Sequence, residues 1–376
     1  MNTQASFIIT PAQRHHPPAI HAMIRELAQF EKLEHLVKGT IADLEKELFG
    51  ERPITEAITA LMDDTPVAFA LYFHNYSTFL GRKGLYLEDV YVKPAFRRRG
   101  IGRGGAIVSF LEMGAAGVPM EGTKGEWGRG QVELNLEHAE PLEMADRHVL
   151  LKHGAREIAE QQGMALTFMP KVAPDEAGSS CHVHASAWDL PGVRNAFWVG
   201  HGGDGEPTAT FRHFLAGQLA VAREVSVLFA PTINAYKRYQ SLSWAPTAIT
   251  WGMDNRTCGF RVVGRGPSFR IENRLPGADA NPYLAYAAMI GAGIYGITHR
   301  LELPDAFSGN AYAAADVLRL PATLREAARA FQHSARVREI LGDDVVDHYA
   351  LTALHEADAY DRAVTDWELA RYFEQS

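Results

Sequence analysis

The sequence has little of several features that would indicate a membrane, secreted or nucleic-acid-binding protein. It contains two cysteines in 376 residues, and Cys181 and Cys258 form neither a ligand pair by spacing nor a disulfide framework, so we expect a cytoplasmic protein. No apolar run approaches the ~20 residues of a membrane-spanning helix, and residues 1–10 lack the pattern of a secretory signal. The net charge of −8 argues against general nucleic-acid binding, so we expect neither a nucleic-acid nor a membrane partner.

The length predicts two or more domains, and the composition divides the chain into two unlike pieces without an internal repeat. The first piece covers residues 1–104, a junction of small apolar residues covers 105–116, and the second piece covers 117–376. Apolar spacing in the first piece predicts helices over 19–33 and 41–49 and strands over 57–62, 66–73 and 84–92. In the second piece it predicts helices over 140–162, 211–228, 283–298, 324–331 and 344–369, and strands over 164–169 and 181–188.

Four short stretches of the second piece alternate polar and apolar residues, at 131–135, 182–184, 255–261 and 270–274. Because side chains of an extended strand alternate between its faces, His182 and His184 share a face, as do Arg270, Glu272 and Arg274. Imidazoles, carboxylates and guanidiniums on rigid strands favour divalent metals with phosphates between them. The pattern therefore predicts an enzyme that uses ATP.

The first piece contains a glycine motif between a predicted strand and a predicted helix. Arg97, Gly100 and Gly102 follow the pattern of a pyrophosphate cradle, although a basic surface turn is an alternative. The stretches 23–28, 49–53 and 85–92 resemble diamine N-acetyltransferases of the GNAT superfamily. The resemblance implies an acetyl-CoA site at Arg97, Arg99, Gly100 and Gly102, with Glu88 and Asp89 near a cationic amine. It ends just after Gly102, without the further strand, helix and catalytic tyrosine of that family, so we expect a partial GNAT-like α/β segment.

The second piece resembles the catalytic domain of glutamine synthetases, and most of all the γ-glutamyl-amine (polyamine) ligases. The matching stretches are 121–133, 167–171, 178–184, 234–238, 254–257, 270–274 and 281–284. This resemblance implies an α+β catalytic domain with an antiparallel sheet and helices. It also implies an ATP-dependent ligase that joins the γ-carboxylate of glutamate to ammonia or an organic amine through a γ-glutamyl phosphate.

The resemblance assigns the metal and phosphate ligands. It implies that Glu126 and Glu133 hold one divalent ion and that His182 and Glu272 hold a second. Oxygen-rich ligands with one imidazole suit Mg²⁺ or Mn²⁺ better than zinc. By the same resemblance, the residues facing ATP and its transferring phosphoryl group are His184, Arg256 and Arg261.

The substrate residues follow from the same resemblance. Arg238 and Arg274 are expected to hold glutamate carboxylates, with Arg274 also counted as catalytic, and the backbone of Gly178 to hold the α-amino group. Trp244 stands six residues after Arg238, where ammonia-using members carry a glutamate, and an aromatic side chain suits a larger amine. Taken singly, these residues have other interpretations: a hydrogen-bonded core histidine, an ion pair at Glu272, or arginines on a solvated loop.

The sequence departs from the family in its front part. The family's N-terminal β-grasp domain and the strand pair with a Glu-x-Glu motif are not recognisable, and the GNAT-like piece stands in their place. The ring homo-oligomers of the family are therefore not a firm expectation. Three hypotheses stay open: a γ-glutamyl-amine ligase, a polyamine N-acetyltransferase that uses acetyl-CoA, and an inactive fusion or pseudoenzyme.

Overall fold

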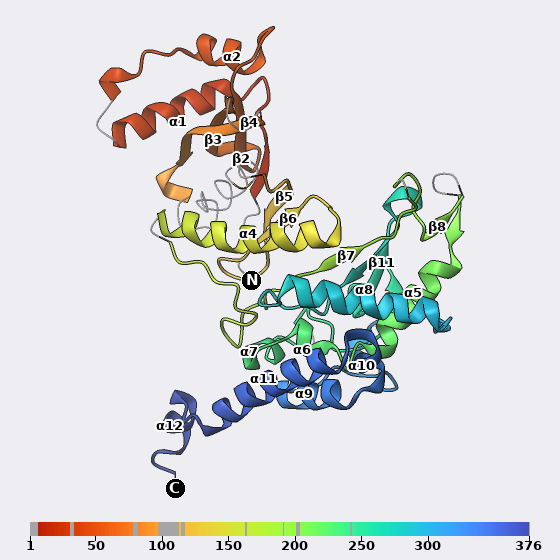
Figure 1. Cartoon of the computed structure of the whole chain (residues 1–376). Coiled ribbons are helices and arrows are strands. Elements are labelled where there is room, and N and C mark those ends of the chain that lie inside the picture. Colours follow the sequence, from red (N-terminus) through yellow and green to blue (C-terminus); the bar gives the residue numbers. More distant parts are fainter. Residues whose placement is uncertain are drawn as a thin grey trace. The chain divides into compact units, whose positions relative to one another are not determined.

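The computed structural model describes residues 7–30, 34–77, 82–96, 113, 117–161, 164–190, 192–200, 204–240 and 243–375. Its backbone forms two compact units, Met1–Thr167 and Phe168–Ser376, whose elements are labelled in Figure 1. The predicted glycine motif at 97–102 and nearly all of the junction at 105–116 lie outside the described residues. The domain boundaries at 104 and 117 stay a prediction.

The front of the first unit is a four-stranded antiparallel sheet with two helices. The strands, in the order β1-β2-β3-β4, are β1 (Phe7–Pro11), β2 (Glu56–Met62), β3 (Thr65–Ser77) and β4 (Arg82–Val92). The helices are α1 (Pro17–Phe30) and α2 (Ile41–Phe49), with single turns η1 (Glu34–Leu36) and η2 (Pro94–Phe96). Ile20 and Met23 of α1 pack with Phe69 and Tyr91 of the sheet in one apolar cluster. These elements confirm the predicted helices and strands of the front piece.

Two short sequence signals fix local structure in this unit. Asp63 and Asp64 have φ angles of +48° and +60°. A type I′ two-residue turn requires positive φ angles at both central positions. Thr40 accepts from the backbone N–H of Asp43, and the Asp43 carboxylate accepts from the N–H of Thr40. This capping box starts α2 at the predicted residue.

A hairpin and a long helix complete the first unit. The elements are β5 (Met120–Gly125), β6 (Val132–Leu136) and α4 (Pro141–Gln161), and Met120, Leu151 and Ile158 share an apolar cluster. The predicted strand at 164–169 is wrong, because this segment is irregular. The N–H of Met164 donates to the carbonyl of Ala159. The first residue of this segment therefore caps the C-terminal end of α4.

The second unit is organised around a four-stranded mixed sheet of short strands. Its order β10-β11-β12-β7 joins β10 (Trp251–Met253), β11 (Phe260–Val263), β12 (Arg270–Asn273) and β7 (Val183–Ala185). Strand β10 is parallel to β11, and the other neighbours are antiparallel. A separate pair consists of β8 (Trp198–Val199) and β9 (Glu206–Pro207).

Two predicted strands of this unit are shorter than expected. The stretch at 181–188 contributes only β7, and the stretch at 255–261 becomes a strand only from Phe260. The side-chain oxygen of Asn255 accepts from the N–H and the hydroxyl of Thr257 at 3.0 and 2.7 Å. Such a local side-chain turn competes with extended backbone, and it places Arg256 on a turn.

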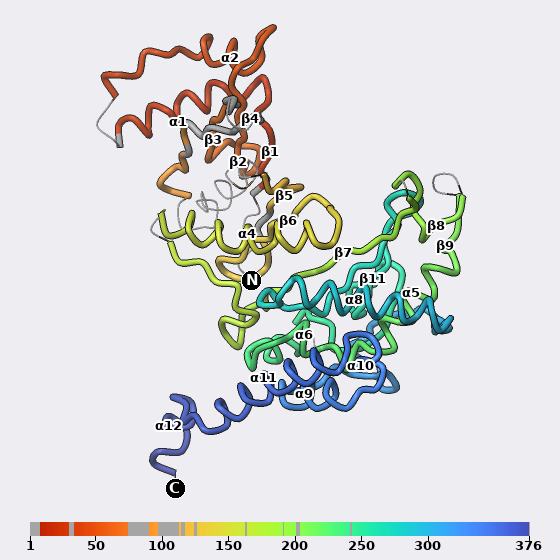
Figure 2. The backbone as a smooth tube through the Cα atoms, in the orientation of Figure 1, coloured from red at the N-terminus to blue at the C-terminus, as the bar shows by residue number. Residues whose placement is uncertain are grey.

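Helices cover one face of this sheet. The helices that the structure describes in this unit are α5 (Ala209–Val221), α6 (Ser226–Phe229), α7 (Ile233–Tyr236), α8 (Pro282–Thr298), α9 (Leu324–His333), α10 (Ala335–Leu341), α11 (Asp343–Arg362) and α12 (Asp366–Tyr372), with η3 (Gly266–Ser268) and η4 (Ala311–Ala313) as single turns. The tube in Figure 2 shows α9, α10 and α11 running together near the C-terminus, where α11 contacts both of the others. Among the described residues, no helix is both long and apolar enough to span a bilayer.

Two predicted helices are each divided in two. The stretch at 211–228 breaks after Val221, and α6 begins at Ser226 without a side-chain cap, although the Ser226 hydroxyl donates to the carbonyl of Arg223 at 2.7 Å. The stretch at 344–369 breaks because Thr365 and Glu368 form a capping box that starts α12. In this second case, local capping overrides an apolar pattern that runs on without interruption.

Glycine permits the close packing of α5 and α8, which lie side by side (Figure 1). A Cβ atom at Gly217 would lie 2.0 Å from the carbonyl oxygen of Ala292, and one at Gly296 would lie 2.1 Å from that of His213. These distances are far below van der Waals contact. The two backbones therefore touch at positions that admit no side chain.

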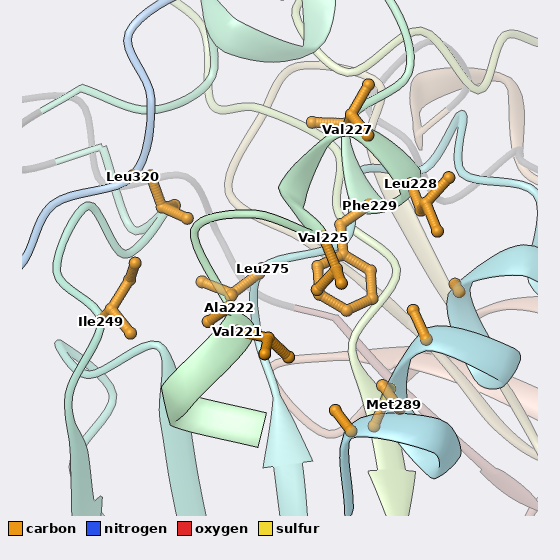
Figure 3. Packing of buried hydrophobic residues seen from close by; sticks show 14 of the residues in the cluster. Val221, Ala222, Val225, Val227, Leu228, Phe229, Ile249, Leu275, Met289 and Leu320 are labelled. Atoms are coloured by element: carbon orange, nitrogen blue, oxygen red, sulfur yellow. The ribbon is translucent and has the colours of Figure 1, made fainter. Parts of the chain in front are cut away.

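The large core of the second unit lies between the helices and one face of the sheet. Figure 3 shows Val221, Val225 and Phe229 packed with Met289 of α8 in this cluster. Phe260, Val262, Phe269 and Ile271 of the β11–β12 region are buried in the same core. Because side chains alternate along a strand, the residues between these apolar positions are directed to the other face.

Candidate active site

The polar face of the second unit's sheet carries a row of charged and titratable side chains. Register pairs Arg261 of β11 with Glu272 of β12, and Glu272 with His184 of β7. Directly paired residues of neighbouring strands point to the same face. The alternation noted in the sequence therefore brings three of the predicted site residues into one row.

Glu272 is the centre of this row. Its side chain is 5% exposed, and it accepts from Arg274 Nη1 at 2.6 Å and from Arg261 Nη1 at 2.8 Å. Burial alone would raise the pKa of the Glu272 carboxyl, but the positive charge of Arg274 and the hydrogen bond from Arg261 outweigh it and lower the pKa overall. Glu272 is therefore a buried carboxylate held between two arginines.

His182 lies beside this carboxylate in the neutral form. Burial, followed by the positive charge of Arg274, lowers its pKa to about 3. Its Nδ1 atom lies 3.3 Å from Glu272 Oε1, but it is a buried atom without a hydrogen-bond partner among the described residues. Two ligands of one cation with bonds of ~2.0–2.6 Å are separated by about this distance. His182 and Glu272 thus fit as two neighbouring ligands of a divalent ion.

The two predicted phosphate arginines lie on neighbouring segments. Arg261 Nε donates to Asp254 Oδ1 at 2.8 Å, so Arg261 joins the exposed Asp254 to the buried Glu272. Arg256 is exposed on the turn after β10. Two adjacent hollows, of about 510 and 570 Å³, share Met253 and Asp254, and Arg261 lines the first while Arg256 lines the second.

The exposed His184 belongs to the same row. Its Nδ1 atom accepts a hydrogen bond from Arg270 Nε at 3.1 Å, so this nitrogen is an acceptor and the hydrogen of a neutral ring is on Nε2. The sequence pattern that grouped Arg270 with Glu272 and Arg274 holds in the structure. Arg270 contacts His184, whereas Arg274 contacts Glu272.

Arg238 and Arg274 occupy buried positions, and Gly178 is half-buried. Arg238 is 2% exposed and Arg274 is 7% exposed. Arg238 Nη2 donates to the carbonyl of Leu275, and its guanidinium lies 4.8 Å from the ring centroid of Tyr239. A Cβ atom at Gly178 would lie 2.5 Å from Arg238 Cγ, so the glycine lets its backbone approach the arginine stem.

Trp244 adopts an uncommon backbone conformation near Arg238. Its φ is +63° and its side chain is 60% exposed. The preceding Ser243 hydroxyl lies 3.0 Å from the carbonyl of Arg238 and 2.6 Å from that of Gln240, as donor to both. A bulky residue in the left-handed region is strained, and such strain is concentrated at functional sites.

The remaining predicted ligands belong to the first unit. Glu126 is exposed at the turn after β5, where its N–H donates to the carbonyl of Gln131, and Glu133 is half-buried on β6. Among the residues that the structure describes, no three His, Cys, Asp or Glu side chains gather as a metal site. The convergence of Glu126 and Glu133 with His182 and Glu272 stays a prediction.

The predicted acetyl-CoA residues are not part of the described structure. Arg97, Arg99, Gly100 and Gly102 lie outside the described residues. Asp89 of β4 is half-buried. The acetyl-CoA assignment therefore stays a prediction.

One residue of this cluster was not singled out from the sequence. Asp254 belongs to the stretch 254–257, but an acidic residue seven positions before Arg261 gives no signal of pairing without the turn between them. The ion pair becomes visible only when the fold brings the two residues together.

Comparison with known proteins identifies the family of each of the two pieces. The glutamine synthetase catalytic-domain family matches residues 106–372, and the chain belongs to the glutamine synthetase family. The acetyltransferase (GNAT) family matches residues 21–104. Both resemblances seen in the sequence are confirmed.

Several curated relatives are ligases named for γ-glutamyl amines. The chain is 53% identical over 264 residues to the γ-glutamylethanolamide synthetase GlnA4 of Streptomyces coelicolor, covering 70% of this chain and 56% of that protein. It is 41% identical over 262 residues to the glutamate–isopropylamine ligase of a Pseudomonas species, covering 69% of this chain and 57% of that protein. The chain thus spans little more than half the length of these relatives.

A solved structure shares the fold. A complex of GmaS with ADP has a TM-score of 0.67 and 30% identity to this chain, and the match covers 74% of this chain and 65% of that one. The predicted α+β fold with a glutamine-synthetase-like domain and a GNAT-like front segment is confirmed.

Proposed function

We propose that the protein is an ATP-dependent ligase that joins the γ-carboxylate of glutamate to an organic amine. The observation that carries this proposal is the cluster of His182, Arg261 and Arg274 around the buried Glu272 carboxylate. The names of the relatives support the reaction class. In this reaction a glutamate carboxylate oxygen attacks the γ-phosphorus of ATP and ADP leaves; the amine nitrogen then attacks the acyl carbon and phosphate leaves.

A divalent ion, when bound, would neutralise the phosphate charge, with His182 and Glu272 among its ligands. Arg261 is held by Asp254 and Glu272, which fixes its guanidinium before substrate arrives. Arg256 is exposed on a turn and able to reach phosphate oxygens. The held guanidinium of Arg261 and the exposed guanidinium of Arg256 together suit a phosphoryl group whose charge is spread over several oxygens.

Trp244 supports an organic amine, rather than ammonium, as the acceptor substrate. An indole has no lone pair for accepting a proton from ammonium, whereas its face attracts an alkyl-ammonium chain. Its exposure of 60% leaves the ring accessible. We therefore assign Trp244 to the acceptor side of the site.

Phosphate release tests this function with the full chain. ATP, L-glutamate and Mg²⁺ or Mn²⁺ are incubated with ethanolamine, isopropylamine, methylamine, putrescine or ammonium. We expect release with at least one organic amine that exceeds release with ammonium, and Trp244→Ala to reduce this preference by about tenfold. A preference for ammonium would reject the acceptor assignment, and no release with any amine would favour an inactive fusion.

Binding of ATP is tested separately from turnover. ATP with Mg²⁺ should raise the thermal unfolding midpoint, because a ligand of the native state stabilises it. Arg256→Ala should remove most of this shift, whereas Arg329→Ala, which changes an exposed arginine of α9, should retain it. An equal shift in the wild type and Arg256→Ala would remove Arg256 from the phosphate site.

A further inference from the structure

The turn that carries Arg256 has a polar side chain on each side of the arginine. Asn255 and Thr257 are half-buried, whereas Arg256 between them is exposed. The side-chain oxygen of Asn255 accepts from the N–H of Thr257 at 3.0 Å and from its hydroxyl at 2.7 Å. These two hydrogen bonds close the backbone into a turn with the arginine at its centre.

The same two side chains connect this turn to a segment that is distant in sequence. The side-chain nitrogen of Asn255 donates to the carbonyl of Gly309 at 2.9 Å. The hydroxyl of Thr257 accepts from the N–H of Ala311 at 2.9 Å. A hydroxyl can donate one hydrogen bond and accept others, so Thr257 makes both of its contacts at once. Each side chain therefore has one hydrogen bond within the turn and one to the segment 307–311.

The segment 307–311 is itself fixed to the second sheet and its core. The N–H of Phe307 donates to the carbonyl of Trp251 on β10 at 2.8 Å. Ala311 is fully buried in a small apolar cluster that includes Cys258, and Phe307 packs against this cluster. The segment therefore gives the turn a support that belongs to the folded core.

Arg256 lines a hollow of about 570 Å³ that is formed by this turn and this segment. The lining residues are 253–256 of the turn and 306–309 of the neighbouring segment. Two carboxylates hold the guanidinium of Arg261, whereas the exposed Arg256 depends on the backbone of its turn for its place. A displacement of about 1 Å in a group that binds a reacting phosphate is enough to weaken its contribution strongly.

We propose that Asn255 and Thr257 are positioning residues, which hold Arg256 toward the phosphates of ATP by anchoring its turn to the segment 307–311. This inference rests on the proposed ligase function, in which Arg256 binds phosphate oxygens. Neither side chain has to contact ATP, because their hydrogen bonds act on the backbone from which the guanidinium extends. Loss of one anchor leaves Arg256 in the chain but lets its turn shift, so the affinity for ATP falls.

The test uses the full chain and a matched pair of substitutions at one position. Thr257→Val keeps the shape of the side chain and removes the hydroxyl, whereas Thr257→Ser keeps the hydroxyl. The control is Thr352→Val on α11, which removes a hydroxyl that donates to the carbonyl of His348 at 2.8 Å. ATP with Mg²⁺ is titrated by calorimetry, and the unfolding midpoint of each variant is recorded. We expect Thr257→Val to weaken ATP binding about tenfold, and the other two variants to change it less than about twofold.

A second measurement separates positioning from general destabilisation. Thr257→Val is combined with Arg256→Ala, and the thermal shift at millimolar ATP measures the weak binding that remains. Without the guanidinium there is nothing left to position, so we expect the added substitution to change ATP affinity less than about twofold. Two independent effects would instead multiply to a further loss of about tenfold. Asn255→Ala should show the same dependence on Arg256.

Each outcome decides the inference. Unchanged ATP binding in Thr257→Val would overturn it, as would an equal loss in Thr257→Ser. A further tenfold loss in the Arg256→Ala background would also overturn it, because the hydroxyl would then act without the arginine. A wild type that binds no ATP would overturn the inference and the proposed function together.

Phosphate release distinguishes failure of the inference from failure of the proposed function. ATP binding that depends on Thr257 through Arg256, without release in the presence of any amine, supports the inference and rejects the ligase. Release together with unchanged ATP affinity in Thr257→Val supports the ligase and rejects the inference.

Discussion

The sheet of the first unit and the sheet of the second unit are built from different kinds of interaction. Strands β2, β3 and β4 span 7, 13 and 11 residues and are connected along the chain by short segments. Strands β7, β10, β11 and β12 span only 3 or 4 residues each. Of the described strands of the second sheet, β10, β11 and β12 follow one another along the chain, and β7 comes from a distant segment; ion pairs between charged side chains supplement these short ladders.

This difference determines where buried charge is found. In the first sheet, Tyr72 donates to Glu56 at 3.3 Å at an exposed position. In the second, Glu272 is buried and binds Arg261 of the neighbouring strand and Arg274, which follows it by two residues. A buried ion pair contributes less net stability than its short distances suggest, but removing one partner leaves an uncompensated charge. The buried ion pairs of the second sheet thus serve a site, and the loss of one partner would lower the stability of the fold.

The largest expected effect comes from neutralising the centre of the second sheet. Glu272→Gln leaves Arg261 and Arg274 without their shared carboxylate, so we expect a loss of about 3–5 kcal/mol in the free energy of unfolding. Phosphate release should fall below detection. Urea unfolding, followed by circular dichroism, measures the first effect.

The matched control is Glu56→Gln in the first sheet, where an exposed contact is worth about 0–1 kcal/mol. A similar loss in both variants would remove the contrast between the two sheets. A stable Glu272→Gln protein would show that the two arginines find other partners or water.

The next effect tests the close contact at Gly178. In Gly178→Ala, the new Cβ would lie 2.5 Å from Arg238 Cγ and 2.9 Å from the carbonyl oxygen of Pro170. Relief requires Arg238 to move, so we expect about 1–3 kcal/mol of destabilisation and weaker L-glutamate binding. In Gly39→Ala of the first unit, a Cβ meets nothing within 4 Å, and we expect no change in binding. Calorimetry and urea unfolding of the two variants compare them directly.

The same contrast explains which elements could be predicted from the sequence. The Asp63-Asp64 turn and the capping box of α2 are local signals, and the elements they bound were predicted closely. The stretch at 255–261 becomes a strand only from Phe260, because the Asn255 side chain accepts hydrogen bonds from Thr257 and holds a turn there. The spacing of apolar residues gives no sign of these side-chain hydrogen bonds.

The candidate site shows the same limit of prediction. Alternation placed Glu272, Arg270 and Arg274 on one face, and the structure agrees. The ion pairs of Arg261 with Asp254 and with Glu272 depend on a turn whose path no periodicity encodes. Family resemblance supplied the roles of residues, but it did not supply these contacts.

A smaller effect concerns pH and returns to the first unit. Burial, then the charge of Lys152, lowers the pKa of His148 on α4 to about 4 from the 6.5 of an exposed histidine. As pH falls through this window, the unfolded state binds a proton that the folded state does not, so stability falls with pH. We expect a loss on the order of 1–2 kcal/mol between pH 7 and pH 5 that His148→Gln removes. The control is His153→Gln, on the same helix with an exposed side chain; an unaltered pH dependence in His148→Gln would contradict the assignment.

The smallest expected effect concerns acetyl-CoA and the front segment. The acetyltransferase match ends at residue 104 and the ligase match begins at 106, so the chain leaves no room between them for a second wall of an acetyl-CoA cleft. A pyrophosphate turn at Arg97, Arg99, Gly100 and Gly102 would then contact only the diphosphate. We expect a Kd no tighter than the millimolar range, which at millimolar acetyl-CoA corresponds to stabilisation of at most about 0.4 kcal/mol. Calorimetry with acetyl-CoA, and with Arg99→Ala as the control variant, measures this directly. Low-micromolar binding that Arg99→Ala abolishes would contradict the expectation, and it would make the front segment a second nucleotide-binding site with its own amine chemistry.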